Sequence, residues 1–273
     1  MIDNLQILSE FYHHIRGMEY DFLVWLSHYR TPFLNILFLF ATLMGSRYFY
    51  ICLIPMLFIF FDKKRAYSFS VLILVSVLIN TIIKEIFAIP RPLDDIVHPL
   101  YTSLAKGFSF PSGHAQGSMT LWGLIIILNR KSVKIIITSI FMILLISFSR
   151  LYLGVHFPTD ILSGWVVGVV VLFCYRFFQA TNLSLSRSAL VTTFATLSIL
   201  FTDAHIRMIS LIIIGICLGK SKKITNGLSD RKAVFCVLLS TISVLIFFKL
   251  IPSYTVLPFT GIGLHLIPST KKI

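Results

Sequence analysis

The chain has 273 residues, of which 56% are hydrophobic and only 13% are charged. Water-soluble domains carry about 25% charged residues, so this composition excludes an ordinary soluble domain and indicates several membrane-spanning helices. The 24 Lys and Arg residues exceed the 11 Asp and Glu residues, which gives a formal net charge of +13. Because the basic residues lie mostly between apolar runs and no nucleic-acid-binding motif accompanies them, we expect them to face a membrane leaflet and not nucleic acid.

Residues 1–30 form the first predicted segment. They include acidic side chains, and they have neither a basic leading region nor a continuous apolar stretch, so they do not resemble a cleavable signal peptide. Their mixed polar and apolar pattern predicts a helix that lies in the membrane interface ahead of the first span.

Apolar runs follow through the rest of the chain. A span needs about 20 apolar residues, so the shorter runs must be tilted, broken or extended by flanking residues. Helices satisfy their backbone polar groups within each segment, as lipid requires. We therefore predict an all-α, polytopic transmembrane helical bundle, with a six-helix core over 31–180 and about three additional helices over 181–273. The runs are Thr31–Gly45, Tyr48–Phe61, Ala66–Ile83, Ala115–Leu128, Val133–Phe148, Phe157–Phe178, Ala189–Thr202, Ile206–Leu218 and Ala233–Ile251.

The basic residues also indicate the orientation of these helices. If the N-terminus is cytoplasmic, most Lys and Arg fall in inside segments, including "DKKR" at 62–65 and "NRKSVK" at 129–134. The positive-inside rule favours this orientation. It places the loops 84–114 and 149–160 on the same outer face.

Those two loops contain three basic side chains near the ends of predicted helices, Lys84, Arg91 and Arg150. Lys supplies a point charge and Arg a planar fork, and both match phosphate oxygens. A single such residue could simply extend toward the lipid headgroups. Three of them in neighbouring loops that also contain two histidines favour an anion-binding site.

The stretch "PSGH", Pro111 to His114, directly precedes an apolar run. Pro111 suits a helix start, Ser112 is a good N-cap, and Gly113 allows a ligand to approach the backbone. A helix that begins here would direct unpaired N–H groups toward an oxyanion. A capped helix start alone would explain Ser112 and Gly113, but it leaves His114 without a role.

The stretch "HFPTD" separates His156 from Asp160 by four residues, so one helical turn would bring the carboxylate to the imidazole. A carboxylate on one ring nitrogen fixes the tautomer and leaves the other nitrogen as a nucleophile or base. A surface histidine beside a helix-capping aspartate is the alternative reading.

Two histidines with different partners suggest a divided catalytic role. His156, oriented by Asp160, would attack phosphorus, and His114 would protonate the departing oxygen. The phosphate-binding groups would be Lys84, Arg91, Arg150, Ser112 and the Gly113 amide. Water would then hydrolyse the phosphohistidine. We expect no metal and no other cofactor, since no carboxylate cluster is present to bind a metal.

These residues closely resemble the signatures of the type 2 phosphatidic acid phosphatase superfamily, which comprises integral-membrane lipid phosphate phosphatases. Its motifs K-x6-R-P, P-S-G-H and S-R-x5-H-x3-D match without departure, in this order. The resemblance covers roughly 20–180 and implies a six-helix core, an outward-facing site, a phosphohistidine mechanism and no metal cofactor. The matching positions are Lys84, Arg91, Pro92, Pro111–His114, Ser149, Arg150, His156 and Asp160.

We therefore expect a membrane phosphatase that acts on a lipid phosphate or diphosphate, in a bacterial inner membrane with its site on the outer face. Undecaprenyl diphosphate is the favoured candidate among several lipid phosphates. The alternatives are a lipid phosphotransferase that uses the same phosphohistidine, and a non-catalytic protein that binds or transports an anionic lipid. The sequence leaves the oligomeric state and the role of 181–273 open.

Overall fold

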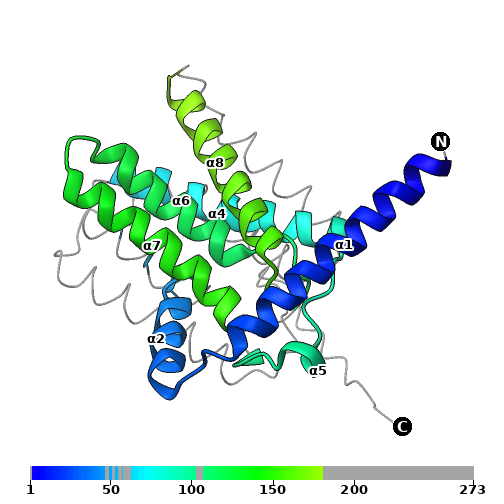
Figure 1. Ribbon diagram of the computed structural model, residues 1–273. Coiled ribbons are helices and arrows are strands. Elements are labelled where there is room, and N and C mark those ends of the chain that lie inside the picture. The colour runs from blue at the N-terminus through cyan, green and yellow to red at the C-terminus, as the bar shows by residue number, and fades with distance from the viewer. Residues whose placement is uncertain are drawn as a thin grey trace, which may run out of the picture. The chain divides into compact units, whose positions relative to one another are not determined.

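A computed structural model of the chain describes residues 2–46, 49–50, 53–54, 57, 63–102 and 107–180 (Figure 1). All the regular structure in this part of the chain is helical, which confirms the predicted all-α class. The predicted helices over 181–273, and most of the predicted run 48–61, lie outside the described residues. The helices are α1 (Ile2–Ser27), α2 (Pro32–Leu43), α4 (Lys63–Phe87), α5 (Asp94–Val97), α6 (Gly113–Leu128), α7 (Val133–Tyr152) and α8 (Pro158–Ala180).

The chain divides into two compact units, which comprise 1–50 with 75–182, and 51–74 with 183–273. Every residue of the predicted site belongs to the first unit. The segment boundaries expected from the sequence, 1–30, 31–180 and 181–273, stay a prediction.

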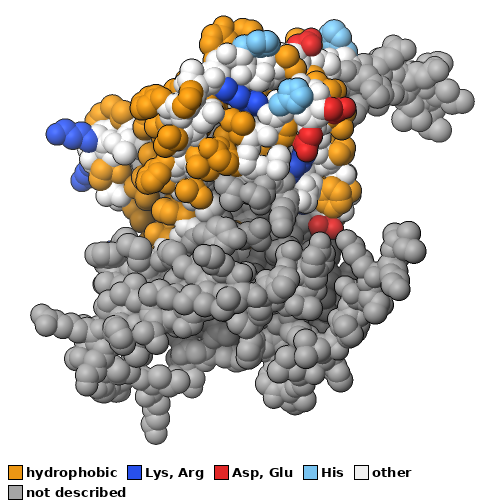
Figure 2. Space-filling view, turned by 90° about the horizontal axis from the view of Figure 1, so that it is seen from below, with side chains coloured by type: hydrophobic (Ala, Val, Ile, Leu, Met, Phe, Trp, Pro, Cys, Tyr) orange, Lys and Arg blue, Asp and Glu red, His pale blue; other side chains and the backbone are white. Residues whose placement is uncertain are grey.

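Three of the described helices are long and apolar enough to cross a membrane: Ser68–Phe87, Val133–Tyr152 and Pro158–Ala180. Large hydrophobic side chains on the last two are exposed, among them Phe141 and Phe173. Figure 2 shows hydrophobic side chains over a wide area of one face, with the acidic and histidine side chains gathered toward one side of it. An outer surface of this kind suits lipid, so the chain is an integral membrane protein.

Side-chain caps fix where the helices begin. Thr31, Ser112 and Ser132 are the N-caps of α2, α6 and α7, and each side-chain oxygen accepts a backbone N–H of the first turn. Pro32 follows the first of these caps, where its missing N–H costs nothing. Ser112 thus ends the loop and starts α6, as its position in the sequence predicts.

α6 packs against both α7 and α8 (Figure 1). Two glycines of α8 allow the close approach of α8 to α6. A Cβ at Gly164 would lie 2.6 Å from the Ser112 carbonyl oxygen, and one at Gly168 would lie 2.8 Å from Met119 Cβ. Small residues at such crossings let membrane helices touch through their backbones. The start of α6 therefore lies directly against the first turns of α8.

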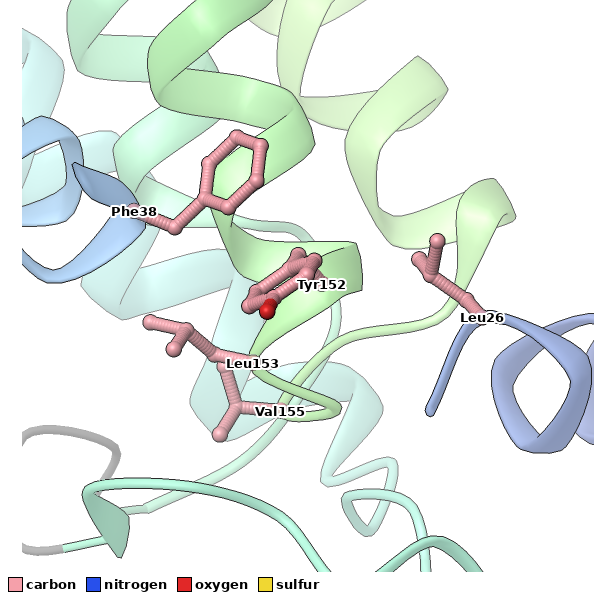
Figure 3. Packing of buried hydrophobic residues seen from close by; sticks show 5 residues of the cluster. All are labelled: Leu26, Phe38, Tyr152, Leu153 and Val155. Carbon is pink, nitrogen blue, oxygen red and sulfur yellow. The ribbon is translucent and has the colours of Figure 1, made fainter. Parts of the chain in front are cut away.

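α2 packs on α7, and α1 contacts both α5 and α7. One buried cluster joins α1, α2 and the end of α7 and comprises Leu26, Phe38, Tyr152, Leu153 and Val155 (Figure 3). A second cluster, of Leu23, Val97 and Phe157, joins α1 to α5 and to the loop before α8. Both clusters include residues beside His156, so the N-terminal helices form part of the structure around the predicted site.

Candidate active site

The loop between α7 and α8 positions His156 and Asp160. Asp160 lies in the first turn of α8, and its Oδ2 is 3.3 Å from His156 Nδ1. The same oxygen accepts the backbone N–H of Phe157 at 2.9 Å. Both side chains are buried, with 1% of His156 and 0% of Asp160 exposed. The four-residue spacing therefore forms the turn expected from the sequence, and the imidazole is held from one side.

The opposite nitrogen of the ring faces Arg91. Arg91 Nη1 lies 3.0 Å from His156 Nε2. A guanidinium only donates hydrogen bonds, so Nε2 must accept and the ring proton must be on Nδ1. Asp160 then receives that proton's hydrogen bond. The tautomer that follows from these contacts leaves the Nε2 lone pair directed at a cationic group, which is where a phosphate would bind.

Ser109 completes the support of this ring and was not identified from the sequence. It is fully buried, with 0% exposed, its hydroxyl donates to Asp160 Oδ2, and its oxygen lies 3.3 Å from His156 Nδ1. The only signal was a polar residue between two phenylalanines in "FSFPSGH". Sequence spacing gives no indication of its partner, because Asp160 is 51 residues away.

Lys84 and Arg91 hold the loop that contains Ser109. Lys84 Nζ donates to the carbonyl oxygens of Phe108 at 2.6 Å and Ser109 at 2.9 Å. Arg91 Nε donates to the Gly107 carbonyl at 2.9 Å. Two residues predicted as phosphate ligands thus also shape the backbone of the site.

Arg150 approaches the site from the end of α7. It is 1% exposed, and its Nη1 donates to the hydroxyl of Thr42 on α2. Its Nε is buried and has no hydrogen-bond partner among the described residues. A buried guanidinium N–H without a partner is costly unless a ligand satisfies it, so this group suits an anion that binds beside it.

The charges in the site act on His156. Burial lowers the pKa of His156 well below its usual value, and neighbouring positive charges lower it further. Burial also lowers the pKa of Arg91 to about 10. At neutral pH the His156 imidazole is therefore uncharged and nucleophilic, while Arg91 keeps its charge. The groups that lower the His156 pKa electrostatically are Arg91, Lys84, Arg150 and His114.

His114 lies in the first turn of α6, directly after Ser112 and Gly113. Its ring lies beside the backbone of Thr42, at the end of α2. The Ser112 N–H donates to the Asp160 carbonyl oxygen at 2.9 Å, which joins the start of α6 to α8.

A Cβ on Gly113 would lie 2.9 Å from Asn80 Oδ1, so the backbone at Gly113 is close to α4. Asn80 is a further residue that the sequence did not single out. Its amide donates to the Pro111 carbonyl at 3.2 Å and to Gln116 Oε1 at 2.9 Å. Asn80 therefore fixes the "PSGH" turn from the side of α4.

The structure brings most of the predicted residues together in two groups. One group links Lys84 and Arg91 to Ser109, His156 and Asp160. In the other, Arg150 donates to Thr42, and His114 lies beside the backbone of Thr42. Within the part of the chain described here, no three His, Cys, Asp or Glu side chains gather as a metal-binding cluster. The arrangement suits nucleophilic attack on a bound anion.

Comparisons with known proteins show which family the chain resembles. The family model described as "PAP2 superfamily" matches residues 65–183. Undecaprenyl-diphosphatase of Sulfolobus acidocaldarius is 28% identical over 169 residues, which is 61% of this chain and 81% of that protein. Phosphatidylglycerophosphatase B of Bacillus subtilis is 29% identical over 167 residues, which is 55% of this chain and 77% of that protein.

A solved structure is also similar. The crystal structure of a transmembrane PAP2 type phosphatidylglycerolphosphate phosphatase from Bacillus subtilis superposes with a TM-score of 0.55 and 25% identity. The superposition covers 63% of this chain and 89% of that one.

Proposed function

Residues 65–183 belong to the PAP2 superfamily, and from this premise we propose that the chain is a membrane phosphatase that removes a phosphate from a lipid phosphate or diphosphate through a phosphohistidine on His156. The main support for the proposal is the set of contacts made by the His156 ring. The Nε2 lone pair of His156 faces Arg91, while Asp160 and Ser109 hold the Nδ1 side of the ring. This is the geometry of an activated nitrogen nucleophile beside a phosphate-binding cation.

In the first step a substrate phosphate binds between Arg91 and His156, with Lys84 and Arg150 close by. The Nε2 lone pair forms a bond to phosphorus, and the bond from phosphorus to the leaving oxygen breaks. Asp160 stabilises the positive charge that develops on the ring. The cations, Ser112 and the Gly113 amide stabilise the charge on the equatorial oxygens, where most of the catalytic effect of a phosphoryl-transfer site arises.

In the complex the negative charge of the bound phosphate stabilises protonated His114, which donates a proton to the departing oxygen, and that oxygen leaves as the lipid alcohol or as the lipid monophosphate. In the second step water attacks the phosphohistidine, the P–N bond breaks and inorganic phosphate is released. His114, now neutral, accepts the proton from that water, so both histidines return to their starting states.

A lipid is the natural substrate for a site held at the ends of membrane helices, because its chain stays in the bilayer while its headgroup enters. Undecaprenyl diphosphate is our favoured substrate, and the relative from Sulfolobus acidocaldarius, whose name is undecaprenyl-diphosphatase, supports it. The similarity to phosphatases of Bacillus subtilis supports a bacterial inner membrane, and the distribution of basic residues supports a site on the outer face.

The test is a panel of lipid phosphates, including undecaprenyl diphosphate, phosphatidic acid and phosphatidylglycerophosphate, assayed for phosphate release by the purified chain in detergent. His156→Ala should abolish release while the substrate still binds. Orthovanadate, which mimics pentacoordinate phosphorus, should inhibit, whereas EDTA should have no effect. Full turnover by His156→Ala would overturn the mechanism.

Two other functions have distinct signatures. A phosphotransferase would pass the phosphoryl group from His156 to an added lipid or sugar hydroxyl in preference to water. A non-catalytic lipid-binding protein would keep its function in His156→Ala and lose it in Lys84→Ala and Arg150→Ala. The oriented tautomer of His156 favours an enzyme over a binding protein, because mere binding needs no nucleophile.

A further inference from the structure

We propose that the C-terminal end of α2, through Thr42 and Gly45, positions Arg150 and His114 for phosphoryl transfer. The inference rests on the proposed function, and it assigns a positioning role to a helix that no catalytic motif includes. Thr42 and Gly45 also lie outside residues 65–183, the part of the chain that the PAP2 model matches.

The first contact is between Thr42 and Arg150. Both are almost completely buried, and the Arg150 guanidinium donates from Nη1 to the Thr42 hydroxyl. A long side chain without a fixed partner would sample several rotamers, and ordering it on binding would cost free energy. The hydroxyl fixes the guanidinium before a substrate arrives. Because Arg150 Nε has no partner of its own, that N–H is held ready for a phosphate oxygen.

The second contact is between the backbone of Thr42 and His114. The last carbonyl groups of a helix lack partners within it, and they carry partial negative charge. At the end of α2 the Thr42 carbonyl accepts the N–H of Gly45 at 3.0 Å, and the His114 ring lies beside the same backbone. A carbonyl only accepts, so it favours a proton on the ring nitrogen nearest to it. The other ring nitrogen is then the one that exchanges a proton with the leaving oxygen.

Gly45 supplies the space that this arrangement needs. A Cβ at position 45 would lie 2.8 Å from His114 Cδ2 and 2.6 Å from Ile146 Cγ2. Separations below about 3 Å do not occur between real Cβ atoms and their neighbours, so any larger residue would displace the imidazole or the helix. The His114 ring can therefore occupy its position only because Gly45 has no side chain.

The test compares Thr42→Val, Thr42→Ser and the control Thr81→Val in the purified full chain. Valine keeps the shape of threonine and removes the hydroxyl, serine restores it, and the Thr81 hydroxyl donates to Val77 within its own helix at 3.0 Å. Hydrogen bonds to charged groups are worth roughly 1.5–3 kcal/mol, so Thr42→Val should weaken orthovanadate binding and raise KM by about 10- to 100-fold. Thr42→Ser should restore most of this loss, and Thr81→Val should match the wild type.

Gly45→Ala tests the contact with His114 and keeps the proposal testable if valine at position 42 prevents folding. Displacement of the general acid should lower kcat by at least about tenfold for a lipid alkyl phosphate, with little change in KM. It should affect p-nitrophenyl phosphate much less, since that leaving group departs without a proton. A purely structural defect would lower both activities equally.

The outcomes separate this inference from the proposed function. One outcome is that Thr42→Val and Gly45→Ala match Thr81→Val in vanadate affinity, KM and leaving-group dependence. In that case α2 does not position Arg150 and His114, although the chain is a phosphatase. If the wild type releases phosphate from no lipid phosphate, the proposed function fails, and vanadate affinity alone then decides the role of Thr42. Failure of the wild type to bind vanadate would overturn both.

Discussion

The Glu19 carboxylate of α1 accepts a 2.7 Å hydrogen bond from the backbone N–H of Thr159, in the first turn of α8. The same carboxylate pairs with Arg16 at 3.0 Å, and the Arg16 guanidinium lies 4.1 Å from the centre of the Phe157 ring. α1 therefore contacts Phe157 and Thr159, two of the three residues between His156 and Asp160. An anion at a helix N-terminus also complements the helix dipole.

Glu19→Ala should lower the stability of the protein by about 1–3 kcal/mol, because it removes a helix cap and leaves the partly buried N–H of Thr159 without this partner. Thermal unfolding in detergent measures the change, and phosphate release should fall with it. Glu85→Ala, which removes an exposed carboxylate, is the matched control. An unfolding temperature equal to that of the control would show that α1 does not support the α8 turn.

Asp160→Asn should lower kcat by about 10⁴-fold without unfolding the protein. An amide with its N–H₂ group toward His156 favours the wrong tautomer, and the attacking nitrogen then carries the proton. Single-turnover trapping of the phosphoryl-enzyme checks the result, since the trapped species should disappear. Persistent phosphorylation of His156 in this variant would mean that another group orients the ring.

Ser109→Ala should lower kcat/KM by about tenfold, which corresponds to the loss of one hydrogen bond to a charged group. Asp160 would keep the bond from Phe157 and the contact with His156. The control is Ser163→Ala, since the Ser163 hydroxyl donates to the Asp160 carbonyl and not to its carboxylate. Equal activity of the two variants would rule out a role for Ser109 in orienting His156.

The acid limb of kcat/KM that belongs to His156 should lie below pH 6.5. Burial and the surrounding cations lower the pKa of His156, so the neutral nucleophile persists as the pH falls and is lost only below that depressed value. NMR titration of protein labelled at the histidine ring carbons, with His156→Asn for assignment, measures this pKa directly. A pKa above 7 would contradict the geometry described for the site.

Local sequence information predicted the parts of the site that depend on spacing within one element. The Ser112 cap and the turn from His156 to Asp160 need only the residues on either side of them, and both form as expected. The helical class follows from apolar composition, because lipid leaves no other way to satisfy the backbone. The three motifs also indicated which loops would meet.

The residues that were missed act across long separations. Ser109 reaches Asp160 51 residues away, and Glu19 reaches Thr159 140 residues away. A lone Ser, Thr or Glu in an amphipathic or apolar segment has many structural uses, and its partner is set by how the helices pack. Lys84 likewise has a second role, bonding the carbonyls of the Ser109 loop, that no spacing pattern indicates.

The close crossing of α6 and α8 at Gly164 has a mechanical consequence. His114 lies in the first turn of α6, and His156 lies in the loop that leads into α8. The contact between these two helices, at a point with no catalytic group, therefore helps to set the separation of the two imidazoles. A methyl group at position 164 would clash with the Ser112 carbonyl, and the start of α6 would have to shift, which would move His114 relative to His156. Attack by His156 and protonation by His114 could then no longer act together on one phosphate, although each histidine would keep its own neighbours. The coordination of the two steps therefore depends on a residue that has no side chain.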